Sequence, residues 1–158
     1  MGNHGPAYYK RYPKEFEKFT PACRTNELSR CSDEEIRNAY DNAILYTDYF
    51  LAQVIALLKA NQEHFETAML YLSDHGESLG ENGIYLHGMP YFLAPEAQRH
   101  VPVILWLGKH YKGIDVAELA ARRHQRFSHD NLFHTLLGFM EIESEAYNPA
   151  LNLLRASQ

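Results

Sequence analysis

The chain has 158 residues, 46% of them hydrophobic and 22% charged, which is enough for one domain with a buried core. Its net charge is −5 and its lysines and arginines are scattered, which argues against nucleic-acid binding, because that binding needs a clustered positive face. No apolar run approaches the roughly 20 residues that cross a bilayer, and the first residues lack the pattern of a signal peptide. We therefore expect no targeting or transmembrane segment in this chain.

Residues 1–31 are predicted to be irregular, because glycines and prolines interrupt them and no period survives between the interruptions. A domain that opens in loop-like sequence suggests a fragment of a larger protein. Within this stretch Cys23 and Cys31 lie too far apart for a CxxC redox or zinc pair. They are either two unrelated thiols or a local disulfide; the polar, turn-prone residues between them favour the disulfide, which would indicate an oxidising compartment.

A long helix is predicted to begin after Ser32, because Ser32 and Glu35 have the spacing of a capping box. Apolar residues then recur at helical spacing as far as Leu58 and predict one buried stripe over about seven turns, with Asn61 at the end.

Two strands and two further helices are expected in the rest of the chain. The strands are residues 68–72 and Val101–Leu107, and the continuous apolar character of the second predicts a central strand of a parallel sheet. Residues 74–95 between them are predicted to form a long glycine-rich loop. The helices are a short one near residues 116–123 and one over residues 129–140 capped by Ser128, followed by a tail that docks in a last short turn.

Asp74 and His75 follow the first strand directly, and open α/β sheets bind ligands beyond the carboxyl ends of their strands. On a tight turn the carboxylate and the imidazole can face one cation, and they would supply two of the four ligands of a tetrahedral zinc site. The alternative is that Asp74 caps a turn and His75 is a solvated loop residue.

His4 and His87 are further candidates, because each precedes a glycine in irregular sequence and could approach a ligand closely. An exposed loop histidine is the alternative for each. From local sequence alone, Glu77 and Glu81 are better interpreted as loop-solvating or capping groups than as acid–base catalysts. The other six histidines are interpreted as structural, and no GxSxG, HExxH, P-loop or GxGxxG motif is present.

Five stretches carry a family resemblance over nearly the whole chain: HGPAYYKRYP, YDNAILYTDYFL, YLSDHGESLGENGIYLHG, VPVILWL and SHDNLFHTLLG. In this order they resemble the carboxy-terminal part of the lipid A phosphoethanolamine transferases, which include the enzymes of colistin (polymyxin) resistance and belong to the alkaline phosphatase and sulfatase superfamily. The resemblance implies an α/β fold: part of an α/β/α sandwich with a mostly parallel sheet, incomplete in this chain. Residues 1–158 would be the carboxy-terminal portion of a periplasmic catalytic domain, which an amino-terminal membrane domain attaches to the inner membrane.

The resemblance also implies an activity and the residues that serve it. In that family a threonine beside zinc takes phosphoethanolamine from phosphatidylethanolamine, through a phospho-threonine, and passes it to a lipid A phosphate. By matching position, Asp74 and His75 would be zinc ligands, His4 and His87 would bind a second zinc or the phosphate, and Glu77 would lie close to the substrate. Cys23 and Cys31 would form one of the family's periplasmic disulfides.

The nucleophile is the main departure from the family pattern. The family's threonine, its glutamate zinc ligand and its membrane helices all match positions upstream of this chain, and no threonine present here has the nucleophile's context. We therefore expect residues 1–158 alone to be inactive and poorly folded. The alternatives are a sulfatase-like or phosphatase-like hydrolase that passes the group to water, and a non-catalytic truncated periplasmic domain.

Overall fold

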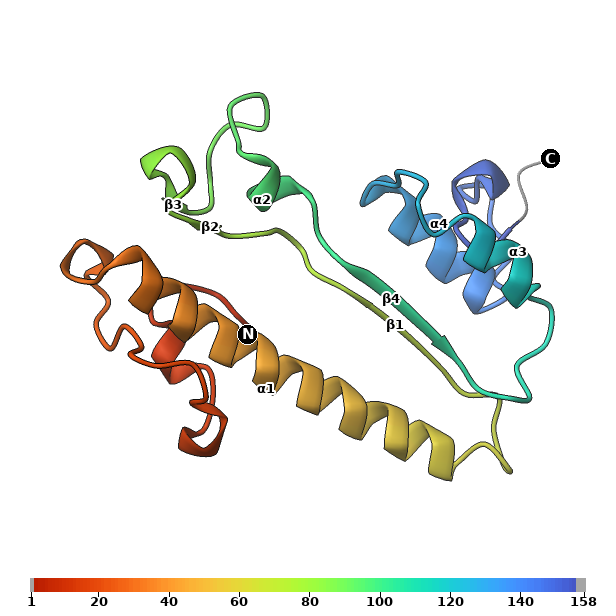
Figure 1. Ribbon diagram of the computed structural model, residues 1–158. Coiled ribbons are helices and arrows are strands. Elements are labelled where there is room, and N and C mark those ends of the chain that lie inside the picture. The colour runs from red at the N-terminus through yellow and green to blue at the C-terminus, as the bar shows by residue number, and fades with distance from the viewer. Residues whose placement is uncertain (1, 156–158) are drawn as a thin grey trace. The chain divides into compact units, whose positions relative to one another are not determined.

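A computed structural model describes residues 2–155, which divide into two compact units, residues 2–109 and residues 110–155 (Figure 1). The first unit begins with three single-turn 3-10 helices, η1 (Tyr8–Lys10), η2 (Lys14–Phe16) and η3 (Leu28–Arg30). The long helix α1 (Asp33–Ala60) follows, and then two small sheets. The second unit contains only short helices and turns among its described residues.

Both ends of α1 lie where the sequence predicts them. The backbone N–H of Glu35 donates to Ser32 Oγ at 3.2 Å, and the N–H of Ser32 donates to Glu35 Oε2 at 2.8 Å, which completes the capping box. Asn61 is the carboxy-terminal cap. The cap therefore satisfies backbone donors that the first turn would otherwise leave without partners.

The buried stripe of α1 is much shorter than predicted. Its buried residues are confined to the first three turns, where Ile36 and Ala39 form a core with Tyr8 and Cys23. Farther along, the side chain of Leu57 is 64% exposed. The predicted seven-turn stripe is wrong for this second half, where the residues of α1 are exposed or half-buried.

Asn42 and a disulfide hold the irregular amino-terminal segment against α1. The fully buried Asn42 accepts from the backbone N–H of Lys18 at 2.7 Å and of Phe19 at 2.9 Å, and its amide donates to the carbonyl of Phe19 at 2.9 Å. The Cys23–Cys31 disulfide is present, which decides between the two interpretations of these cysteines. Side-chain hydrogen bonds and a covalent link thus replace regular secondary structure here.

The two longer strands pair in the direction opposite to the one predicted. β1 (Ala68–Leu72) and β4 (Val103–Leu107) are antiparallel, with Ala68 opposite Leu107, and they form a two-stranded sheet among the described residues. The prediction of a central parallel strand at Val101–Leu107 is therefore wrong for its pairing within this chain. A continuous apolar run indicates how much of a strand is buried, but it carries no information about strand direction.

The glycine-rich stretch after β1 is a small hairpin rather than a structureless loop. β2 (Ser78–Leu79) and β3 (Tyr85–Leu86) pair antiparallel, with the 3-10 turn η4 (Glu81–Gly83) between them and the short helix α2 (Glu96–Arg99) after them. Gly80 and Gly83 have φ values of 120° and 73°, which favour glycine. The Glu81 carboxylate accepts from the backbone N–H of Leu79 at 2.7 Å, so the capping role predicted for Glu81 is confirmed.

The second unit confirms the predicted helices. They are α3 (Val116–Ala121), capped by Asp115, and α4 (Asp130–Phe139). The N-cap of α4 is His129 rather than the predicted Ser128, although Ser128 Oγ accepts from the backbone N–H of Asp130 at 3.3 Å. The tail docks through the turn η5 (Pro149–Leu151) on α4, where the buried hydroxyl of Thr135 accepts from the backbone N–H of Leu153 at 3.0 Å.

Helix α1 corrects one expectation about membranes. It has 28 residues and contains an 18-residue window of mean hydropathy 1.3, so its length and composition would allow it to cross a bilayer. The expectation that no segment of the chain meets this criterion is therefore wrong.

Candidate metal and phosphate site

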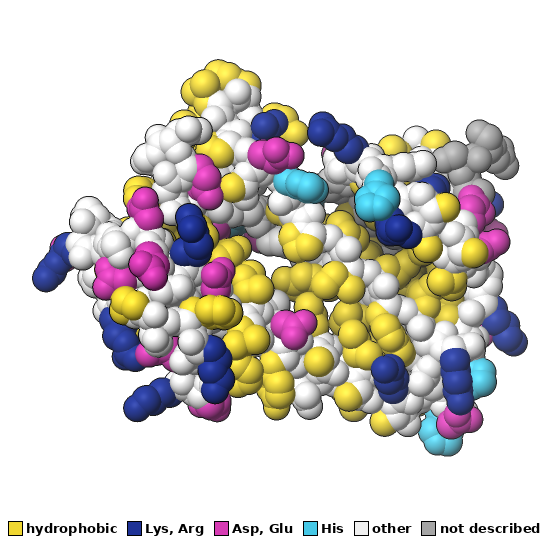
Figure 2. Space-filling view, in the orientation of Figure 1, with side chains coloured by type: hydrophobic (Ala, Val, Ile, Leu, Met, Phe, Trp, Pro, Cys, Tyr) yellow, Lys and Arg dark blue, Asp and Glu magenta, His cyan; other side chains and the backbone are white. Residues whose placement is uncertain are grey.

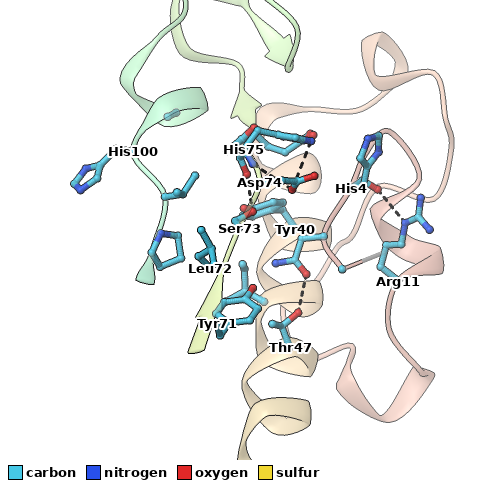
Figure 3. A pocket seen from close by; sticks show the side chains of 18 of the residues that line it. His4, Arg11, Tyr40, Thr47, Tyr71, Leu72, Ser73, Asp74, His75 and His100 are labelled. Atoms are coloured by element: carbon cyan, nitrogen blue, oxygen red, sulfur yellow. Dashed lines mark hydrogen bonds and ion pairs between the residues drawn. The ribbon is translucent and has the colours of Figure 1, made fainter. Parts of the chain in front are cut away.

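Three histidines from distant parts of the first unit form one cluster. His4 precedes η1, His75 follows β1 and His87 follows β3, and one ring nitrogen of each lies within 4.8 Å of those of the other two. The rings of His75 and His87 stack with their centroids 3.9 Å apart, and His4 meets His87 edge-on at 4.7 Å. Figure 3 shows His4 and His75 arriving from different segments at the same end of a cleft.

Hydrogen bonds of their own or neighbouring residues hold two of these histidines in place. Arg11 Nε donates to the carbonyl of His4 at 2.9 Å, and Asn3, the preceding residue, is bonded to Thr47 of α1 at 2.9 Å. After His75, the N–H of Gly76 donates to the carbonyl of Gln98 in α2 at 3.0 Å. The two imidazoles are therefore attached to α1 and α2 through their own chain segments.

Hydrogen bonds select one tautomer for each ring. His4 Nδ1 lies 2.7 Å from the carbonyl oxygen of Gly5, and His75 Nδ1 lies 2.9 Å from that of Gly76. Because a carbonyl oxygen only accepts, Nδ1 must carry the proton in both rings. Each neutral ring then keeps the lone pair of Nε2 for a ligand.

A buried carboxylate does the same for His87. Glu77, whose side chain is only 4% exposed, has Oε1 at 2.5 Å from His87 Nδ1, and its Oε2 accepts from the hydroxyl of Tyr8 at 2.5 Å. Burial, together with the hydrogen bond to the Glu77 carboxylate, raises the pKa of Tyr8 well above its usual range, so Tyr8 remains a donor. Both oxygens of Glu77 are occupied, so the interpretation of Glu77 as a solvated loop group is wrong.

Asp74 lies at the exposed edge of this cluster. Its side chain is 90% exposed, and its Oδ1 lies 4.0 Å from Nε2 of the neighbouring His75. The structure thus brings His4, His75 and His87 together, while Asp74 adjoins them through His75 without joining the set of three.

The cleft that leads to the histidines has a volume of about 660 Å³ and runs between α1 and β1 (Figure 3). Tyr40, Thr47 and Phe50 line it from the helix, and Tyr71 lines it from the strand. Apolar side chains lie along its length and imidazoles at its end, which suits a ligand with a polar head and an apolar body.

The donor set fits a transition-metal ion. Three neutral imidazoles with their Nε2 lone pairs available are typical ligands of zinc, and the carboxylate behind His87 is the usual support of a metal-binding histidine. Sequence reasoning singled out all three histidines but missed Tyr8, which lies 69 residues from Glu77 and matches no motif spacing. The one available signal was the general need of a buried tyrosine hydroxyl for a partner.

Comparison with known proteins identifies the family. The model of the family described as Sulfatase matches residues 1–142. The chain belongs to the sulfatase family. The phosphoethanolamine transferase EptA of Salmonella typhimurium is 50% identical over 159 aligned positions, which cover 98% of this chain and 29% of that protein.

Two solved structures confirm the resemblance seen in the sequence. The carboxy-terminal periplasmic domain of the phosphoethanolamine transferase EptC from Campylobacter jejuni is 54% identical, with a TM-score of 0.84 over 97% of this chain and 48% of that domain. The integral membrane protein lipooligosaccharide phosphoethanolamine transferase A from Neisseria meningitidis is 43% identical, with a TM-score of 0.92 over 97% of this chain and 29% of that protein. The sulfatase-like α/β fold class is thereby confirmed.

The share of each relative that aligns with this chain shows how much of the relative it represents, and whether α1 is included. The chain spans less than a third of the Salmonella relative and about half of the Campylobacter periplasmic domain. Since the match to that domain covers 97% of this chain, it includes the greater part of α1.

Proposed function

We propose that this chain forms part of the catalytic domain of a zinc-dependent phosphoethanolamine transferase at the periplasmic face of the inner membrane. The observation that carries the proposal is the cluster of three imidazoles, found in a sulfatase-family chain whose relatives are named phosphoethanolamine transferases. The proposal concerns the whole protein, of which residues 1–158 would be the carboxy-terminal portion of the catalytic domain.

The proposed reaction moves one phosphoryl group twice. A threonine hydroxyl attacks the phosphorus of phosphatidylethanolamine and releases diacylglycerol. This threonine would belong to a region of the whole protein outside residues 1–158. An oxygen of a lipid A phosphate then attacks the phospho-threonine and frees the threonine. The product carries an added ammonium group, which lowers the net negative charge of lipid A and would weaken its attraction for cationic polymyxins.

Some residues of this chain would bind metal, and others would bind either a second metal or the phosphate of the substrate. Asp74 and His75 would bind zinc, which polarises the nucleophile and stabilises charge on the phosphoryl oxygens. His4 and His87 would bind a second zinc or the phosphate of the substrate. Glu77 would orient His87, since both of its oxygens are already hydrogen-bonded.

Mass spectrometry of lipid A from cells expressing the full-length gene tests the proposal. The wild-type gene is expected to add phosphoethanolamine, while Asp74→Ala or His75→Ala should abolish the addition and lower the zinc content of the purified protein. His64→Ala is the control, because His64 is an exposed histidine away from the cleft.

Three outcomes would contradict the proposal. Unmodified lipid A together with release of free phosphoethanolamine would identify a hydrolase. Unchanged lipid A modification and unchanged zinc content in Asp74→Ala would show that Asp74 is not a metal ligand. A full-length protein that binds no zinc and modifies no lipid A would favour a non-catalytic domain.

A further inference from the structure

Tyr8 and Glu77 form a buried pair behind the histidine cluster. The side chain of Tyr8 is 1% exposed, and its ring packs edge-on against Tyr40 with 5.4 Å between centroids. Its hydroxyl donates to one oxygen of Glu77, and the other oxygen accepts from His87 Nδ1. Tyr8, Glu77 and His87 are thus connected by two consecutive hydrogen bonds, and we call them the Tyr8 relay.

We propose that Tyr8 is a positioning residue that acts through Glu77 to hold His87 in the tautomer whose Nε2 lone pair faces the ligand. This inference rests on the proposed function of the cluster as a metal or phosphate site. It adds a role for a residue that touches neither metal nor substrate.

The three histidines differ in what selects their tautomers. His4 and His75 are bonded at Nδ1 to the carbonyl of the next residue, which no side-chain substitution removes. His87 depends on a carboxylate instead. A side-chain change can therefore release the ring of His87 while leaving the other two rings in place.

The carboxylate in turn depends on Tyr8. A buried carboxylate is costly unless its oxygens accept hydrogen bonds, and the Tyr8 hydroxyl supplies the bond to Oε2. Without that donor, Oε2 is buried without a partner, so Glu77 turns away from its site toward another donor. This movement weakens Oε1 as an acceptor for His87 Nδ1.

Close packing leaves the Tyr8 hydroxyl little freedom to move. A Cβ atom placed on Gly5 would lie 2.6 Å from the hydroxyl oxygen of Tyr8 and 2.6 Å from a methyl carbon of Leu86. Gly5 follows His4 and Leu86 precedes His87, so the hydroxyl is enclosed by the two segments that carry these histidines. The relay therefore joins the His4 and His87 segments at one point.

The test compares Tyr8→Phe with Tyr12→Phe in the full-length protein. Each substitution removes one hydroxyl from a buried tyrosine, but the hydroxyl of Tyr12 lies 3.4 Å from the Asn42 amide, whereas that of Tyr8 donates to Glu77. The first measurement is nitrogen NMR of histidine-labelled, metal-free protein, with the His87 signals identified by their loss in His87→Ala. The second is zinc affinity, measured by competition with a chelating dye.

In the wild type and in Tyr12→Phe we expect His87 with the proton on Nδ1. In Tyr8→Phe we expect a mixture of the two tautomers and a zinc affinity lowered about 10- to 100-fold, the usual cost of losing a group that supports a metal ligand. Combining Tyr8→Phe with Glu77→Gln should cost less than the sum of the two single effects, because both act on one relay.

A single Nδ1-protonated tautomer of His87 in Tyr8→Phe would overturn the inference. If Tyr8→Phe lacks the near-ultraviolet circular dichroism of the folded protein, the same NMR measurement of His87 is made on Glu77→Gln instead. An unchanged His87 tautomer in Glu77→Gln would then overturn the inference. The NMR measurement requires neither zinc nor transfer activity, so failure of the relay is distinguishable from failure of the proposed function.

Discussion

His75 owes its place in the cluster to the absence of a side chain at the next residue. Gly76 lies directly on the backbone of α2, where its N–H bonds to the carbonyl of Gln98 and its Cα faces the carbonyl of Ala97. A Cβ atom at Gly76 would overlap that carbonyl, and a backbone carbonyl cannot rotate away as a side chain can. The contact with α2 therefore requires glycine.

Gly76→Ala is predicted to move His75 out of the cluster. Relief of the overlap must shift either the loop after β1 or α2, which we expect to lower the free energy of unfolding by about 1–3 kcal/mol. Because His75 is then displaced, the zinc content of the full-length protein and its modification of lipid A should also fall. Gly2→Ala is the control for stability, since no heavy atom lies within 4 Å of a Cβ atom placed there. Equal stability and zinc content in both variants would show that the loop accommodates the methyl group.

At the scale of elements, the amino-terminal segment depends on α1 for its backbone hydrogen bonds. Asn42 on the inner face of the helix bonds to three backbone groups, the N–H of Lys18 and both the N–H and the carbonyl of Phe19. Asn38, one turn earlier and half-buried, makes a single solvent-exposed bond to the carbonyl of Pro21 at 2.8 Å. The two asparagines make the same kind of contact at very different depths.

Asn42→Ala is therefore predicted to be far more destabilising than Asn38→Ala. Removal of the buried amide takes away the partner of the N–H and of the carbonyl of Phe19, while the N–H of Lys18 keeps its bond to the carbonyl of Phe16 at 3.0 Å. The loss should cost about 2–4 kcal/mol in the free energy of unfolding. The exposed groups released by Asn38→Ala can bond to water, so its cost should stay below about 1 kcal/mol. Urea unfolding of the full-length variants measures both values. Similar costs for the two variants would mean that Asn42 does not hold the segment to the helix.

Elements with local signals were predicted from the sequence, and elements set by distant contacts were not. Ser32 and Glu35 define the start of α1 within four residues, so the helix start was predictable. The residues of β1 that pair with β4 lie 31 to 39 positions away in the sequence, and no local pattern specifies them. In the site, His4 and His87 became candidates through their glycine neighbours and a family motif, whereas Tyr8 joins Glu77 only in three dimensions.

At the scale of the whole molecule, the first unit carries an apolar surface that the described residues leave open. The exposed fractions are 57% for Phe50 and 64% for Leu57 on α1, and 49% for Val103 on β4. Figure 2 shows hydrophobic side chains gathered over these helix and strand segments. A group of exposed apolar side chains on one surface is characteristic of an interface. The related periplasmic domain is about twice as long as this chain, so we expect the additional residues of the whole protein to cover it.

Thiol labelling at Leu57 tests that expectation. Both cysteines of the chain are in the disulfide, so Leu57→Cys introduces the only free thiol in residues 1–158. In the chain alone this thiol should react rapidly with a maleimide, and in the full-length protein at least about tenfold more slowly, because a covered side chain reacts only when the structure opens. Lys59→Cys is the control, since position 59 lies about 200° around the helix from position 57 and should react rapidly in both proteins. Equally fast labelling of Leu57→Cys in both would show that this face of α1 stays open to solvent in the whole protein, and the apolar surface would then need another partner.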